Sequence, residues 1–319
     1  MKVSKKFIAV LAIVTCLILA LALVNDMKVE INVEGEGVGN LISMFGGSDN
    51  SSQKAPLNVA ETTAPVVQTP VIQAPADNAE AQQTTAAPSV SNTSLPSTNE
   101  EIIKKYTELV DKFKIEKPAY KKKEFQALPE EYRNFGTAVN VILNLASGYM
   151  TTEEDCEELV RAKGSSEEIL YDMPIHGVEK GCVLTDYNAV SWAKCEDIGN
   201  GNCKISFSLK EEVNAEPTPA ETLVPVSAHG AVMQPVKRSD ITTEVDKITS
   251  SVRGLSLNQF DLTYRDCVFE CVYNSQTNQV SSITHHVVID IAADIKLFTS
   301  NINGTARLLN EMLIYDITW

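Results

Sequence analysis

Residues 191–210 read SWAKCEDIGNGNCKISFSLK, and this stretch decides the fold class. From Cys203 to Lys210 apolar and polar side chains alternate, which is the pattern of a strand in a sheet with one dry face. The central Gly199-Asn200-Gly201-Asn202 is rich in residues that accept the positive φ of a tight turn. The sequence therefore predicts an antiparallel hairpin made of residues 191–196 and 203–210.

Three further strand-like segments follow the hairpin, at residues 259–273, 280–291 and 305–319. A polar turn at 274–278 joins the first two, and Asn301-Ile302-Asn303-Gly304 is expected to carry the second return. The C-terminal part of the chain is therefore predicted to form a three-stranded antiparallel meander.

Helical periodicity precedes and interrupts these strands. A helix is predicted from Glu100, capped by Thr98 or Asn99, to a stop at Pro118. Further helices are predicted at 136–147, from Thr151 or Thr152 to before Gly164, and from Ser239 or Asp240 onward. Helices followed mostly by antiparallel strands indicate an α+β fold, with helices packed on a mostly antiparallel sheet in a single domain over residues 100–319.

The N-terminus carries a membrane signal. Residues 7–24 contain no charged side chain and are just long enough to cross a hydrocarbon core of about 30 Å. Lys2, Lys5 and Lys6 precede this run, so the N-terminus is expected in the cytoplasm and the remaining chain outside the cell. Residues 1–27 are thus predicted to be a cytoplasmic stub and a single-pass signal-anchor helix in the lipid bilayer of the cell membrane.

Two alternatives for this segment remain open. Ala20-Leu21-Ala22 offers a cleavage site for a secretory signal peptide, and Cys16 offers a less favourable lipoprotein signal. All three readings deliver the same extracellular domain.

Two segments separate the anchor from the domain. Residues 28–46 contain several glycines and are interpreted as a juxtamembrane segment. Residues 47–99 lack Phe, Tyr and Trp and are rich in Ala, Thr, Ser, Gln and Pro, so they cannot bury enough apolar surface to offset chain entropy. They are predicted to be a disordered linker that holds the domain away from the bilayer.

The charge balance limits the partners. The net charge is −15, from 42 acidic and 27 basic residues. Nucleic acid would be repelled, so no nucleic-acid partner is expected.

Six cysteines follow Cys16: Cys156, Cys182, Cys195, Cys203, Cys267 and Cys271. An even number outside the cell favours disulfides. The pair Cys195 and Cys203 flanks the hairpin turn. A two-residue turn at Asn200-Gly201 places them on opposite faces, whereas a loop of three or five residues places them side by side. A disulfide between Cys195 and Cys203 therefore stays open at this point.

Residues for catalysis or metal binding are not indicated. The chain contains no G-x-S-x-G, H-E-x-x-H or P-loop motif, and no cofactor is expected. His285 and His286 are adjacent on a predicted strand, so they point to opposite faces and cannot share one metal ion. No catalytic residue and no metal site are predicted.

A binding role is the first functional hypothesis. The ectodomain would hold an apolar or cell-envelope-derived ligand between sheet and helices, as a membrane-anchored extracytoplasmic binding module. The candidate lining is apolar: Phe207, Leu209, Phe269, Val287 and Ile289. The alternatives are a non-catalytic structural or sensory ectodomain that engages another envelope protein, and an envelope enzyme of unidentified type.

Several segments of residues 100–319 resemble a group of proteins. They include Tyr120-Lys121-Lys122, Met173-Pro174-Ile175-His176-Gly177, Ala193-Lys194-Cys195-Glu196-Asp197 and Leu262-Thr263-Tyr264-Arg265-Asp266-Cys267. The group consists of uncharacterised membrane-anchored extracytoplasmic proteins of anaerobic Gram-positive bacteria. The resemblance implies an envelope location, no assigned activity and cysteines that stay reduced. In outline, the expected fold is also similar to lipoprotein-carrier domains, which hold acyl chains against a concave apolar sheet.

Overall fold

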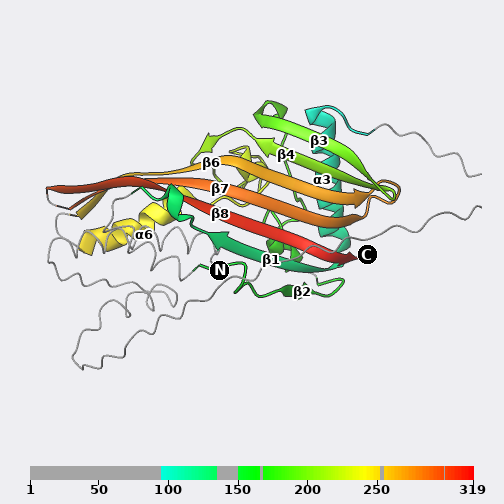
Figure 1. Cartoon of the computed structure of the whole chain (residues 1–319), viewed down its shortest axis with the longest axis horizontal. Helices are drawn as coiled ribbons and strands as arrows, with labels where there is room; N and C mark the ends of the chain where they lie inside the picture. The colour runs from blue at the N-terminus through cyan, green and yellow to red at the C-terminus, as the bar shows by residue number, and fades with distance from the viewer. Residues whose placement is uncertain (1–94, 135–149, 166–167, 252–254, 298) are drawn as a thin grey trace, which may run out of the picture.

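The computed structural model describes residues 95–134, 150–165, 168–251, 255–297 and 299–319 (Figure 1). The predicted membrane-spanning segment, the juxtamembrane segment, nearly all of the linker and the helix predicted at 136–147 lie outside these residues. Within them, no helix combines the length and the apolar character needed to cross a membrane.

The domain is built on one eight-stranded sheet whose neighbouring strands run antiparallel. Its strand order is β2-β1-β8-β7-β6-β4-β3, and the short β5 pairs with β6. The strands are β1 (Ala119–Ala127), β2 (Leu159–Arg161), β3 (Val190–Gly199), β4 (Asn202–Leu209), β5 (Glu212–Val213), β6 (Leu255–Asn274), β7 (Val280–Leu297) and β8 (Ser300–Thr318). This sheet-dominated architecture confirms the α+β class.

Helices and short turns accompany the sheet. They are α3 (Asn99–Glu116), η1 (Glu130–Tyr132), α5 (Ile169–Asp172), η2 (Tyr187–Ala189), η3 (His229–Ala231) and α6 (Arg238–Ser251). α3 crosses behind the strands in the view of Figure 1, while α6 lies near the far ends of the long strands β6, β7 and β8. One face of the sheet therefore carries α3, and we call it the inner face.

α3 begins where its sequence indicates. The Thr98 side chain accepts a hydrogen bond from the Glu101 backbone amide, and the Glu101 carboxylate accepts one from the Thr98 amide, so a complete capping box starts the helix. The helix ends at Lys117, which adopts the left-handed conformation just before Pro118. Ile103, Tyr106 and Phe113 on its apolar face are fully buried.

The predicted hairpin and meander are present with longer strands. Asn200 and Gly201 both have positive φ and form the two-residue turn between β3 and β4. In the meander, β6, β7 and β8 extend beyond the predicted segments. The second return lies between Leu297 and Ser300, because residues 301–304 already pair with β7. The predicted position of that return was wrong.

The helix predicted from Thr151 or Thr152 to before Gly164 was also wrong. The Thr152 hydroxyl accepts a hydrogen bond from the Asp155 amide as a cap would, but only a turn follows. The acidic residues that come next offer no continuous apolar face for a helix to bury. Leu159–Arg161 instead pairs with β1 as strand β2.

Candidate functional site

The apolar set predicted to line a ligand site lies in the core. Exposed fractions are 0% for Phe207, Phe269, Val287 and Ile289 and 2% for Leu209. The rings of Phe207 and Phe269 stack with their centres 5.2 Å apart, and Tyr106 of α3 meets Phe207 edge-on at 4.9 Å. The space between α3 and the sheet is thus occupied by protein side chains. A binding role of these five residues stays a prediction, and their packing accounts for them as core.

The two adjacent histidines separate as the strand alternation requires. His285 faces inward and its Nε2 lies 2.9 Å from the Tyr106 hydroxyl, whereas His286 faces outward and is hydrogen-bonded through Nδ1 to Glu311. The Glu311 carboxylate raises the pKa of His286. Among the residues that the structure describes, no three His, Cys, Asp or Glu side chains gather as a metal site would need.

The cysteines of the hairpin are placed by a bulge. The turn has two residues, yet a register shift between Asp197 and Gly199 sets Cys195 opposite Ile205 and Asp197 opposite Cys203. Cys195 and Cys203 therefore share the inner face on a diagonal, and both are free thiols whose pKa values burial raises. From the sequence, a two-residue turn was expected to place the two cysteines on opposite faces. That expectation was wrong, because the bulge places them on one face. The disulfide itself stays a prediction.

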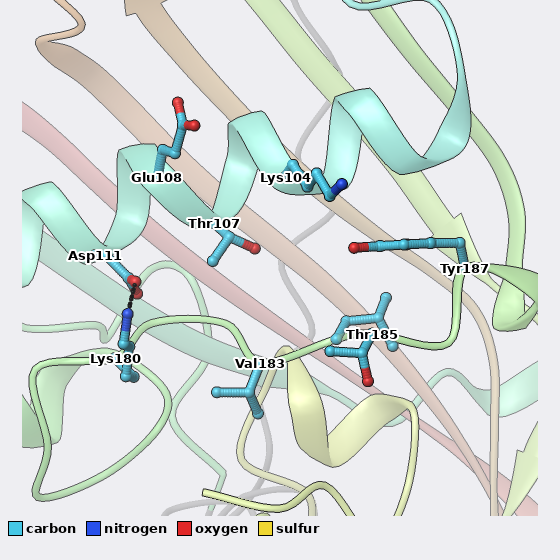
Figure 2. A pocket seen from close by; sticks show the side chains of 9 residues that line it. Lys104, Thr107, Glu108, Asp111, Lys180, Val183, Thr185 and Tyr187 are labelled. Carbon is cyan, nitrogen blue, oxygen red and sulfur yellow. Dashed lines mark hydrogen bonds and ion pairs between the residues drawn. The ribbon is translucent and has the colours of Figure 1, made fainter.

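A surface hollow of about 380 Å³ lies between α3 and the segment that leads into β3. We call it the α3 hollow. It is lined by Lys104, Thr107, Glu108, Asp111, Lys180, Val183, Leu184, Thr185 and Tyr187. Figure 2 shows the Lys104 amine and the hydroxyls of Thr107 and Tyr187 pointing toward one another across this space. Its size falls in the range of small-molecule sites, roughly 300–1,000 Å³.

Hydrogen bonds clamp the two walls of the α3 hollow together. The Asp111 carboxylate accepts from the Lys180 amine at 2.7 Å and from the Gly181 amide at 2.8 Å. A Cβ at Gly181 would lie 2.8 Å from the Val110 side chain, so glycine permits this close approach. The loop is thus held against the helix on one side of the hollow, which gives the site a fixed width.

A buried lysine holds the same loop from below. Lys114 is fully buried, and its amine donates to the backbone carbonyls of Met173, Ile175 and Lys180 at 3.3, 2.7 and 3.0 Å. Burial lowers the pKa of Lys114 to about 7, while the neighbouring Asp111 carboxylate acts in the opposite direction. Three carbonyl acceptors match the three N–H donors of an ammonium group, and the Lys180 carbonyl also accepts from the Ile175 amide at 2.9 Å.

The rim of the α3 hollow is charged but balanced. Lys104 forms an ion pair with Glu100 at 2.6 Å, and Lys105 forms one with Glu108 at 3.3 Å. The hydrogen bond to Glu100 raises the pKa of Lys104, so its amine stays protonated and cannot act as a nucleophile near neutral pH. Donors and acceptors surround apolar walls formed by Val183, Leu184 and the Tyr187 ring.

A second hollow, of about 440 Å³, lies where β4 leaves β6. Exposed Trp192 and buried Ser208 border it. Arg265 also borders it and precedes a register shift in β6 that ends at Val268. Arg265 is already bound to Glu211 and Asp290, each at 3.0 Å. Because this hollow is mostly polar, whereas the α3 hollow combines apolar walls with polar groups, the α3 hollow is the better candidate site.

The α3 hollow was not predicted, because its walls come from residues 104–111 and 180–187, which only the fold brings together. One wall of the hollow did have a signal in the sequence. The spacing of Lys104, Thr107, Glu108 and Asp111 places all four residues on one side of a helix. In comparisons with other proteins, no family model, no curated protein and no solved structure matches this chain. The geometry of the α3 hollow is therefore the basis for the candidate site.

Proposed function

We propose that this protein is a membrane-tethered extracytoplasmic binding module, and that its α3 hollow holds a hydroxyl-rich glycan fragment of the cell envelope. The tether and the outward orientation rest on the uncharged run 7–24 and the lysines before it. The ligand site that we propose is on the outer side of α3 rather than between the sheet and the helices, because side chains fill that interface.

One observation carries the ligand class. The Tyr187 ring, Val183 and Leu184 form apolar walls, and amines, hydroxyls and carboxylates stand around them (Figure 2). A sugar ring has an apolar C–H face and a rim of hydroxyls that both donate and accept hydrogen bonds. Such a ligand can use the aromatic wall and both kinds of polar group at once.

The experiment is isothermal titration calorimetry of the full chain in detergent with soluble glycan fragments released from cell wall by a muramidase. Tyr187→Ala should weaken binding at least about tenfold, because it removes the aromatic wall. Lys104→Met should weaken it several-fold, and since Lys104 is 60% exposed this variant should keep its fold.

Tyr171→Ala is the matched control. Tyr171 is 60% exposed and lies outside the hollow, so its loss should leave the affinity unchanged. The absence of any binding heat with wild type would contradict the proposal. So would equal losses in Tyr187→Ala and Tyr171→Ala.

A further inference from the structure

β3 forms one edge of the sheet. It pairs with β4 on one side, and no other strand among the described residues pairs with its second side. An edge strand presents unpaired N–H and C=O groups that can template pairing with another chain. β3 runs from Val190 to Gly199, whereas the opposite edge strand β2 has only three residues. β3 is therefore the longer free edge.

The outward side chains of β3 form an ordered series. Trp192, Lys194 and Glu196 follow one another on the outer face, and Ile198 comes next in the bulge, without a partner residue in β4. Their exposed fractions are 44%, 59%, 46% and 49% in that order, so all four are accessible. Lys194 and Glu196 are paired with each other at 2.7 Å within the strand, and their opposite charges stand at positions symmetric about Cys195.

We infer that β3 pairs with β3 of a second copy of this chain, antiparallel, around a two-fold axis through Cys195. In this register Lys194 lies opposite Glu196 of the second copy, and Glu196 lies opposite its Lys194. A two-fold interface must be self-complementary, and the Lys194 and Glu196 pair satisfies that requirement in charge.

The neighbouring registers are excluded by charge. Shifting the axis by one residue toward the start of β3 sets Lys194 opposite Lys194 of the second copy. Shifting it toward the end sets Glu196 opposite Glu196 of the second copy. Like charges directly opposite one another destabilise a strand pair, so the register centred on Cys195 is selected.

Cys195 marks the axis on the inner face. It is half-buried and opposite Ile205 of β4, and its thiol forms no disulfide and lies 3.7 Å from the Tyr273 hydroxyl. Directly opposite residues of antiparallel strands have Cβ atoms about 4.5–5.5 Å apart, which is close enough for an added oxidant to join two cysteines with a small adjustment. Formation of a disulfide between the two Cys195 residues therefore reports where the axis lies.

A charge-swap series tests the pairing, with the full chain in detergent micelles and its mass measured by light scattering after size-exclusion chromatography. Wild type should be a dimer. Glu196→Lys and Lys194→Glu should each be at least about tenfold weaker in dimerisation, because each places like charges opposite one another.

Two combinations of these substitutions restore opposite charges across the interface, and they make the test specific. A one-to-one mixture of the two single variants should form dimers again, since lysines of one chain then face glutamates of the other. The double variant Lys194→Glu/Glu196→Lys should also dimerise like wild type. Circular dichroism melting should show equal folding for all four chains. A monomeric wild type, single variants as dimeric as wild type, or a mixture that stays monomeric would each overturn the pairing.

Oxidation with diamide gives an independent readout on non-reducing gels. Diamide takes up the two thiol hydrogens as a disulfide forms between the two Cys195 residues, so wild type and Cys203→Ser should yield a covalent dimer and Cys195→Ser should not. Dimer bands that persist in Cys195→Ser, or that vanish in Cys203→Ser, would contradict the register. Lys194 and Glu196 lie outside the α3 hollow, so failure here leaves the glycan proposal standing, and the reverse holds as well.

Discussion

At the scale of single residues, His286 and Glu311 couple the outer face of the sheet to pH. The Glu311 carboxylate accepts a hydrogen bond from His286, which raises the pKa of the histidine above its ordinary value of 6.5. The folded chain therefore holds this proton more tightly than the unfolded chain does. The resulting stability is present in full below about pH 6.5 and is lost as the pH rises through the folded-state pKa.

The prediction compares two variants by urea unfolding at about pH 5.5 and about pH 8. From the lower to the higher pH, the free energy of unfolding should fall less in Glu311→Gln than in wild type. The reason is that the carboxylate that raises the pKa of His286 is gone. Glu270→Gln is the control, since that outer-face carboxylate pairs with Lys204 rather than with a histidine. An unchanged pH dependence in Glu311→Gln would refute the coupling.

At the scale of elements, Lys114 joins α3 to the loop after α5. Its amine binds three carbonyls of residues 173–180 and is fully buried, so the helix and the loop share one polar anchor. That loop continues directly into the wall of the α3 hollow. Lys114→Met should destabilise the domain by about 3 kcal/mol, because it removes the side-chain donor from the buried Met173 and Ile175 carbonyls.

Urea unfolding measures this loss, and Lys104→Met is the matched control on the exposed side of the same helix. The control should leave the free energy of unfolding nearly unchanged, because a surface ion pair contributes little to stability. If the two variants lose the same stability, Lys114 is not the anchor that its contacts indicate.

Local signals predicted local elements well. The capping box at Thr98 and the Asn200-Gly201 turn were sufficient to place α3 and the β3–β4 hairpin, because both act within a few residues. β1 was missed as a strand because three consecutive lysines, Lys121 to Lys123, obscure its alternation. Its partner strand lies near the far end of the described chain, and no local pattern reveals such a pairing.

The side-chain register was harder to predict than the elements. The bulge near Ile198 moves Cys195 and Cys203 onto one face, although the turn has the expected length. In β6, Asp266 has a positive φ within a second register shift, and Cys267 is turned inward. A single extra residue reverses the facing of every side chain beyond it, and the sequence does not mark where it is inserted.

At the scale of the whole molecule, the proposed tether makes a prediction about orientation. Protease added to intact cells that carry a C-terminally tagged chain should remove the tag, because residues 100–319 are proposed to face outward. The cleavage should fall first in residues 47–99, which are predicted to be disordered. A tag that resists protease until the cells are lysed would exclude the outward orientation.

The pairing of β1 with β8 has a consequence for biosynthesis. β1 leaves the ribosome early, yet the strand it must lie beside is made only after nearly two hundred further residues. Until then its edge is a hazard for aggregation, and Lys121, Lys122 and Lys123 make that edge repel similar chains. The lysines that obscure the strand pattern in the sequence thus oppose pairing of β1 with other chains before β8 is available. The sheet is complete only after β8 has been synthesised.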